Sequence, residues 1–438
     1  MSTIPQVAHA LNVLLNSTAD AAARRTNFVQ RRSKLTGARF VQSLVFGWLK
    51  NPRASLEELT QTTAALGVGI TPQGLDQRFG PKAAATLEQV LQAAVTRVIA
   101  GQPAAIPLLQ RFSSVVLLDS SIVTLPDALA HVWSGTGSRT GQGKAALKIQ
   151  VRLDLCTGAL AGPFLQDGRC HDRTSPLQKD PLPPGSLRLA DLGYFSLGVL
   201  KDLDRQGVFY LSQLQAQTLV FDQSGQVLDL PRVLRACNPE PVDLAVFMGN
   251  KHRLPVRLLA APVEPSVAKE RRRRLKLDAR RRCQSVSKAR LALADWTILV
   301  TNTPPDLLSL EEALVLARAR WQIELLFKLW KQHGQIDSWR TQKPWRMLCE
   351  LYAKLLAVLV QHWLMVVSCW ACPERSLVKG AYTIRGYALM LASAMGGFIR
   401  LAAVIELVGR TISAGCRMNP RRRKPNTYQL LLGDGGGA

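Results

Sequence analysis

A fifteen-residue segment near residue 320 combines charged and apolar side chains in a pattern that suits chemistry on an anionic substrate. The segment reads ARARWQIELLFKLWK and covers residues 317–331. In a regular helix of 3.6 residues per turn, Arg320, Glu324 and Lys331 share one narrow face, so that one carboxylate is framed by two cations. The apolar residues on the opposite side are Ile323, Leu326 and Trp330. The same spacing also fits an ordinary ladder of surface salt bridges, and spacing alone does not separate the two interpretations.

Two short apolar runs that read as strands end at aspartates. Asp119 follows one run in SSVVLLDSS, and Asp191 follows the other in SLRLADL. Between them, the alternating segment 147–155, a Thr157-Gly158 turn and the segment 159–165 predict a β-hairpin. Strand-end acids in this order fit a mixed α/β sheet, although aspartates at strand ends also commonly cap turns. The roles of His171-Asp172, in a loop, and of Lys148, on the alternating strand, stay open.

Taken together, these segments resemble the insertion-sequence-four family of bacterial DDE transposases. Arg320, Glu324 and Lys331 match the family's signature of tyrosine, arginine, glutamate and lysine, while Ala317 stands where the family has tyrosine. The resemblance extends from about residue 35 to 427. It implies that Asp119, Asp191 and Glu324 are the catalytic and metal-binding triad. It also implies that Trp296 stacks on a base flipped out of the transposon end, although a buried core tryptophan is the alternative.

The resemblance implies a reaction that suits three carboxylates. Phosphodiester hydrolysis followed by joining of the freed 3′-OH to target DNA is in-line displacement at phosphorus, which two Mg²⁺ ions assist, with Mn²⁺ as a substitute. Carboxylate oxygens are ligands that Mg²⁺ prefers. Arg320 and Lys331 would position DNA phosphates beside the metal ions.

The charge balance independently predicts a polyanionic partner. The 438 residues include 56 Lys and Arg against 31 Asp and Glu, a formal net charge of +25. Neutralising DNA phosphates would remove the self-repulsion that such a charge creates. A ribosomal-type or membrane-surface protein would also account for the charge alone.

A basic run inside the chain is the strongest local charge feature. The segment 269–290, KERRRRLKLDARRRCQSVSKAR, contains eleven Lys or Arg residues and two acids. Because it lies between strand-like pieces and is not a terminal tail, it predicts a phosphate-contacting helix, with a solvated face as the alternative. The arginines assigned to DNA binding are Arg271, Arg272, Arg273, Arg274, Arg280, Arg281 and Arg282.

Cysteine usage and apolar runs favour the cytosol. The eight cysteines show no disulfide framework, and the Cys369/Cys372 pair has no second pair at zinc spacing. The first twenty residues lack an export signal. The apolar run 355–370 is short for a membrane span and contains Gln361 and His362, so it predicts a buried helix. We therefore expect a cytoplasmic, nucleoid-associated protein with no membrane partner.

These features predict an α/β protein with an RNase H-like mixed-sheet core that is interrupted by a β-rich insertion. The expected regions are a helical DNA-binding region at 1–110, a first part of the core at 111–213, an insertion with a basic helix at 214–305, a core helix carrying Glu324 at 306–345, and a helical region with a basic tail at 346–438. In the first region, Ser55 with Glu58 predicts a capping box, and Thr71-Pro72 predicts a helix start. The short helices there resemble a helix-turn-helix, a pattern that is also common in other helical bundles.

Three functions fit the sequence to different degrees. An active transposase would cut transposon ends and join them to target DNA, with double-stranded DNA as partner, both terminal inverted repeats and target, and a homodimer in the DNA complex. A catalytically silent DNA-binding protein derived from such an enzyme is the alternative that Ala317 favours. A peripheral membrane protein that uses its basic charge is a distant third.

Overall fold

The computed structural model describes residues 2–31, 33–137, 143–420 and 425–433 and divides into two compact units. The first contains residues 1–110, 119–170 and 321–438, and the second contains residues 111–118 and 171–320. The basic tail at 421–424 and the last five residues lie outside the described residues. The chain passes between the units four times, after Gln110, Leu118, Cys170 and Arg320, and the second of these passages lies inside β1 (Val115–Leu125).

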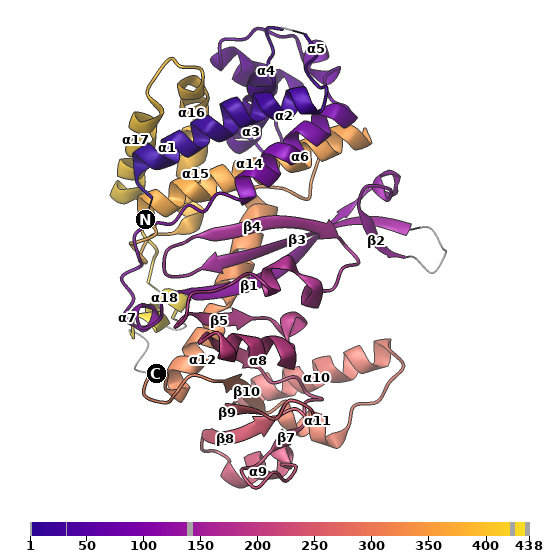
Figure 1. Ribbon diagram of the computed structural model, residues 1–438, viewed down its shortest axis with the longest axis vertical. Helices are drawn as coiled ribbons and strands as arrows, with labels where there is room; N and C mark the ends of the chain where they lie inside the picture. Colours follow the sequence, from indigo (N-terminus) through magenta and orange to yellow (C-terminus); the bar gives the residue numbers. More distant parts are fainter. Residues whose placement is uncertain (1, 32, 138–142, 421–424, 434–438) are drawn as a thin grey trace. The chain divides into compact units, whose positions relative to one another are not determined.

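The first unit combines a helical bundle with a small sheet (Figure 1). Its N-terminal helices are α1 (Ile4–Asn12), α2 (Ala19–Arg25), α3 (Gly37–Lys50), α4 (Leu56–Ala65), α5 (Pro72–Asp76), α6 (Pro81–Val95) and α7 (Pro107–Gln110). Its later helices are α13 (Trp321–Lys328), α14 (Pro344–Cys369), α15 (Leu377–Gly386), α16 (Ala388–Met395), α17 (Leu401–Ala414) and α18 (Thr427–Leu431). Its strands are β2 (Ser134–Gly137), β3 (Gly143–Asp154), β4 (Leu160–Asp167) and the second part of β1 (Val115–Leu125).

Local sequence signals account for the helix starts in this bundle. The Ser55 hydroxyl accepts the backbone N–H of Glu58, whose carboxylate accepts the backbone N–H of Ser55, so the expected capping box is formed. The Thr71 hydroxyl caps α5, which begins at Pro72. The expected hairpin is also present, as β3 paired with the antiparallel β4.

Helix α14 is the core of the bundle and is longer than the apolar run suggested. It spans 26 residues and packs against α3, α6 and α17. It is long and apolar enough to cross a membrane, but 89% of its most apolar window is buried inside the protein. The prediction of a buried helix is therefore confirmed. Two charged residues, Glu350 and Lys354, lie in this buried helix. Their side chains form an ion pair at 2.8 Å, which compensates both charges.

The second unit is built on a mixed sheet covered by helices (Figure 1). Its strands are the first part of β1, β5 (Leu187–Ala190), β6 (Phe209–Gln213), β7 (Val220–Phe221), β8 (Val242–Met248), β9 (Leu254–Pro262) and β10 (Trp296–Thr301). Its helices are α8 (Leu197–Arg205), α9 (Leu230–Cys237), α10 (Pro265–Arg281), α11 (Lys288–Leu293) and α12 (Leu310–Ala319). Strands β1, β5 and β6 are parallel, and β10, β9, β8 and β7 continue antiparallel. The mixed α/β class is thus confirmed.

The β-rich insertion contains more helix than the sequence indicated. The segment between β7 and β8 contributes only an isolated bridge between Val227 and Phe221. Helix α9 begins immediately afterwards, capped by the Asp229 carboxylate, which accepts the backbone N–H of Arg232. After β5, a 3₁₀ turn, η5 (Leu192–Tyr194), precedes α8, which begins at Leu197.

A buried histidine makes the stability of the first unit dependent on pH. His362 on α14 is 1% exposed, and its Nε2 lies 2.8 Å from the Gly158 carbonyl oxygen. Burial lowers the pKa of His362 to about 4. Since the unfolded chain binds a proton near pH 6.5, the unfolded state holds more protons than the folded state between about pH 6.5 and 4. We expect the free energy of unfolding to fall by up to ~1.4 kcal/mol per pH unit as pH decreases through this window.

Denaturant titrations at pH 7 and pH 5 test this expectation. His362→Gln should lose much of the pH dependence, while the same change at the exposed His9 should keep it. Equal pH dependence in all three proteins would show that His362 does not carry the effect.

Candidate active site

The first two acids of the candidate triad come directly after strand segments that pair in parallel. The first strand was expected to end at Asp119, but β1 continues to Leu125. Within the second unit, Val115–Leu118 of β1 lie beside Leu187–Ala190 of β5, and Leu118 is the partner of Ala190. Asp119 and Asp191 are the next residues along the two strands. Parallel strands run in the same direction, so the register assigns the two aspartates to equivalent positions at the carboxyl ends of this ladder.

Burial changes at the same point on both strands. The four residues of β1 before Asp119 are at most 3% exposed, as expected for a central strand covered on both faces. Asp119 and Ser120 are half-buried, and Asp191 has a side chain that is 50% exposed. Each aspartate therefore lies where its strand segment leaves the apolar interior. At such a position a carboxylate can contact solvent or substrate.

A cation and a turn hold the second aspartate. The Arg320 guanidinium lies 3.9 Å from Asp191 Oδ1, and Asp191 also caps η5 by accepting the backbone N–H of Gly193. Asp172 packs nearby, because a Cβ at Gly193 would come within 2.7 Å of Asp172 Oδ2. The structure thus brings together two of the predicted site residues, Arg320 and Asp191, and places one open candidate, Asp172, beside the same turn.

The helix expected to run through residues 317–331 is broken in two places. Helix α12 ends at Ala319, Arg320 forms the cap, and Glu324 lies on the separate helix α13. A π-helical turn, η6 (Leu329–His333), follows and contains Lys331. The single regular helix assumed from the sequence is therefore wrong. Arg320 belongs to the second unit, while Glu324 and Lys331 belong to the first.

The division of this segment into buried and exposed sides was nevertheless correct. Ile323, Leu326 and Trp330 are at most 4% exposed, while Glu324 on the opposite side is only half-buried. Lys331 Nζ donates to the Ile122 carbonyl oxygen at 2.8 Å. This bond fixes the end of the Glu324 segment to β1, three residues beyond Asp119, within the first unit.

Trp296 lies in the interior of the second unit. It begins β10, is 7% exposed, and belongs to an apolar core with Val242, Ala260 and Leu258. This burial is what the core alternative expects, and base stacking by Trp296 stays a prediction. Lys148 is also buried and donates to the Cys170 carbonyl oxygen at 2.5 Å, so it faces neither solvent nor DNA.

The basic helix α10 is present, and its arginines divide into two groups. Arg271 is turned inward, donating to the Trp296 carbonyl oxygen at 2.9 Å and to the Thr297 hydroxyl at 3.1 Å, and burial lowers its pKa. Arg272 forms an ion pair with Asp295. Arg271 thus connects α10 to β10, and Arg272 connects it to the residue before β10. Their assignment as DNA contacts stays a prediction.

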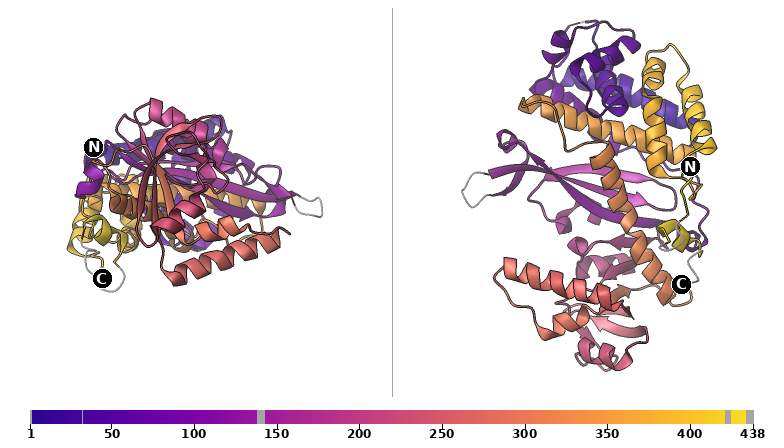
Figure 2. Two further views of the ribbon diagram at one scale, coloured as in Figure 1. Left: turned by 90° about the horizontal axis from the view of Figure 1, so that it is seen from below. Right: turned by 180° about the vertical axis from the view of Figure 1, so that it is seen from behind.

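The remaining arginines of this group face solvent. Arg273 and Arg274 share the Glu270 carboxylate at 2.7 and 2.8 Å, and Arg281 lies 3.6 Å from Asp278. Arg280 and Arg282 are exposed as well. Figure 2 shows the C-terminal part of α10 extending beyond the strands of its unit, so this end can reach a partner.

Residues 110–360 match the family described as transposase DDE domain. The chain belongs to this family. It is a transposase, an enzyme of the polynucleotidyl transferase and endonuclease class. The expected resemblance is thereby confirmed at the level of the family.

Named relatives agree with this assignment. The transposase of insertion sequence element IS231C from Bacillus thuringiensis subsp. berliner is 29% identical over 371 residues, which cover 79% of this chain and 77% of the relative. The transposase of IS1151 from Clostridium perfringens is 23% identical, with the same two coverages. The transposase of IS421 from Escherichia coli is 26% identical and covers 77% of this chain and 88% of its own.

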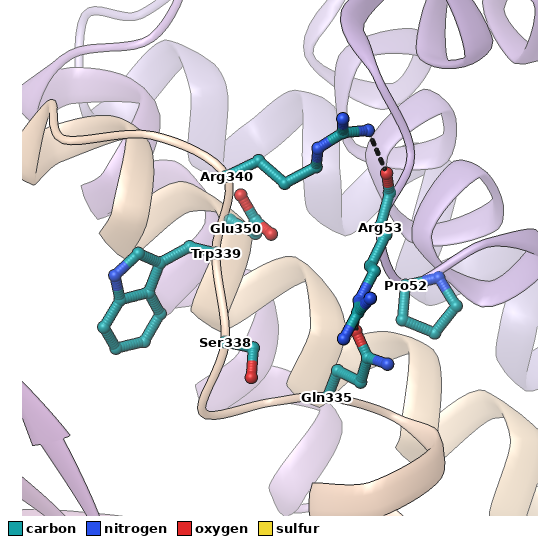
Figure 3. A pocket seen from close by; sticks show the side chains of 7 residues that line it. All are labelled: Pro52, Arg53, Gln335, Ser338, Trp339, Arg340 and Glu350. Atoms are coloured by element: carbon teal, nitrogen blue, oxygen red, sulfur yellow. Dashed lines mark hydrogen bonds between the residues drawn. The ribbon is translucent and has the colours of Figure 1, made fainter.

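Sequence reasoning missed a cavity of about 410 Å³ in the first unit (Figure 3). Arg53, Trp339 and Arg340 contribute to its walls, and Glu350 lies at its base. The arginines are isolated charges in turns that carry no periodic pattern, so no signal in the sequence connects them.

Substitution of Arg271 tests the division of the α10 arginines into an inward group and a solvent-exposed group. Arg271→Ala should lower the free energy of unfolding by about 1–3 kcal/mol, because it removes a buried donor from the Trp296 carbonyl oxygen. Arg280→Ala should change it by less than about 0.5 kcal/mol. Chemical denaturation of the two variants makes the comparison, and equal losses would contradict the inward role of Arg271.

Proposed function

We propose that the transposase cuts the ends of its element and joins them to target DNA with Asp119, Asp191 and Glu324 as metal-binding residues. The observation that supports this most strongly is the β1–β5 register, which makes Asp119 and Asp191 equivalent positions on parallel neighbours. Glu324 is half-buried on a segment that Lys331 ties to β1. The donor set is all carboxylate oxygen, which fits Mg²⁺, with Mn²⁺ as a substitute, better than softer metals.

Each residue has a defined task in this proposal. The three carboxylates bind two Mg²⁺ ions, which when bound activate the attacking oxygen and stabilise the leaving one. Arg320, paired with Asp191, is placed to bind a phosphate through its planar fork. Lys331 supplies a second positive charge within η6. Together the cations orient the scissile phosphate before the displacement begins.

The exposed end of α10 contributes affinity for DNA outside this centre. Arg280 and Arg282 are exposed, and Arg273, Arg274 and Arg281 share acids that also reach solvent. Contacts of such side chains with phosphates are independent of sequence and weaken with salt. We further propose that the DNA partners are terminal inverted repeats and target DNA, that a homodimer forms in the DNA complex, and that the protein associates with the nucleoid.

One observation favours the silent DNA-binding alternative. Ala317 lies on α12 at the position where the resemblance expects a tyrosine, three residues before Arg320. An alanine side chain cannot donate a hydrogen bond to a phosphate. Excision of the element from a plasmid by the wild-type protein would reject this alternative, whereas excision only by Ala317→Tyr would favour it.

Substitution of the acids tests the proposed centre. Asp119→Asn, Asp191→Asn and Glu324→Gln should each reduce Mg²⁺-dependent cleavage of a plasmid carrying the DNA that flanks the gene by at least about a hundredfold. Binding to the same DNA in EDTA should stay within about threefold of wild type, because the contacts to phosphates remain.

Asp202→Asn is the matched control, since this exposed aspartate on α8 pairs only with its neighbour Arg205 among the described residues. It should cleave as wild type does. Normal cleavage by any one of the three acid variants would remove that residue from the centre.

A further inference from the structure

The cavity of the first unit has a charged rim above a rigid polar base. Arg53 enters it from the turn between α3 and α4, and Arg340 enters from the loop that follows η6 (Figure 3). Both arginines are exposed. The volume of about 410 Å³ lies within the range of about 300–1,000 Å³ that ligand sites occupy.

A buried ion pair holds the base in place. Lys354 is 2% exposed and donates to Glu350 at 2.8 Å and to the carbonyl oxygens of Gln335 and Ser338 at 3.0 and 2.7 Å. An ammonium group has three N–H donors, so this arrangement uses all of them. Lys354 compensates the charge of Glu350. The guanidinium groups of the two arginines are therefore the charges that a ligand in the cavity would contact.

Hydrogen bonds also orient the two arginines without using their full capacity. Arg53 Nε donates to Gln335 Oε1 at 3.0 Å, and one terminal nitrogen of Arg340 donates to the Arg53 carbonyl oxygen at 2.9 Å. Within the described part of the chain, the other guanidinium nitrogens of both residues have no hydrogen-bond partner. Gln335 adopts φ +47°, a conformation that costs a non-glycine residue of order 1 kcal/mol and persists only where surrounding contacts impose it.

We propose that this cavity binds a backbone phosphate of the DNA on which the transposase acts. A guanidinium offers paired N–H donors that match two phosphate oxygens, and charge-assisted bonds of this kind are stronger than neutral ones. The rim carries the guanidinium groups of Arg53 and Arg340 beside the polar side chains of Gln335 and Ser338. The overall charge of +25 favours a polyanion over a single small anion.

The position along the chain relates the cavity to the proposed active centre. From Glu324 to Gln335 the chain runs through α13 and η6, a span of roughly 16 Å at helical rise. Such a span matches about five base pairs of duplex DNA at ~3.4 Å each. The inference rests on the proposed function only in taking DNA as the partner.

Equilibrium binding of the full chain to duplex DNA in EDTA tests the proposal separately from catalysis. Arg53→Gln and Arg340→Gln should each weaken binding about tenfold. Each should also reduce the slope of log affinity against log salt concentration by about 1, as expected for the loss of one phosphate contact. Arg410→Gln is the matched control, because Arg410 is an exposed arginine of the same unit outside the cavity, and it should bind as wild type does.

A second pair of variants tests the cavity without removing an arginine, so that a loss of DNA binding cannot be attributed to unfolding. The Ser338 side chain is exposed and lines the cavity, so Ser338→Asp adds a negative charge at its rim without disturbing the core. It should weaken DNA binding, and Ser338→Ala should not. Wild-type affinity and salt dependence in Arg53→Gln, Arg340→Gln and Ser338→Asp would overturn the proposal.

Titration with a free deoxynucleoside monophosphate distinguishes the source of the phosphate. The proposal predicts no saturable binding of the free nucleotide at concentrations where duplex DNA saturates the protein. Tight binding of the nucleotide that Arg53→Gln abolishes, with DNA binding unchanged, would instead make the cavity a nucleotide site and reject the DNA contact. These outcomes do not depend on the acidic triad, since no cleavage is measured.

Discussion

The parallel ladder between β1 and β5 joins Leu118 to Ala190 and thereby fixes the register of the residues that follow them. The ladder's residues on β1 are buried, so a slip by one position toward the interior would move the Asp119 carboxylate to the buried position of Leu118, where burying an unpaired charge is costly. The proposed centre depends on this constraint. Shifting either strand would separate Asp119 from the position equivalent to Asp191, whatever the remaining residues did.

The third acid depends on a different kind of constraint. Glu324 follows a break in the helix at Arg320 and precedes a π-helical turn that carries Lys331. Packing of the apolar side holds α13, and the bond from Lys331 to the Ile122 carbonyl oxygen holds its end. Arg320 is fixed separately through Asp191. In one regular helix the directions of these three side chains would be fixed relative to one another. Because the helix is interrupted, the contacts of each side chain determine its direction separately.

Local signals in the sequence predicted much of this arrangement. The capping box at Ser55 and the apolar side of segment 317–331 depend on neighbours in the chain, and both predictions are confirmed. The strand that ends before Asp191 was also predicted, but β1 continues past Asp119 to Leu125. Features that depend on partners far along the chain could not be predicted in this way. Arg271 looks like its exposed neighbours in the sequence, but the Trp296 carbonyl oxygen draws it inward. The cavity at Arg53 joins segments almost 300 residues apart, so no spacing rule could reveal it.

Iron-directed cleavage of the polypeptide tests the central claim most directly. Fe²⁺ replacing Mg²⁺ at carboxylate ligands, with ascorbate and peroxide, generates radicals that cut the backbone close to the metal. The account predicts cuts near residues 119, 191 and 324 in one protein, all of which excess Mg²⁺ suppresses. Cuts confined to one of these regions, or placed elsewhere in the chain, would contradict a centre built from the three acids.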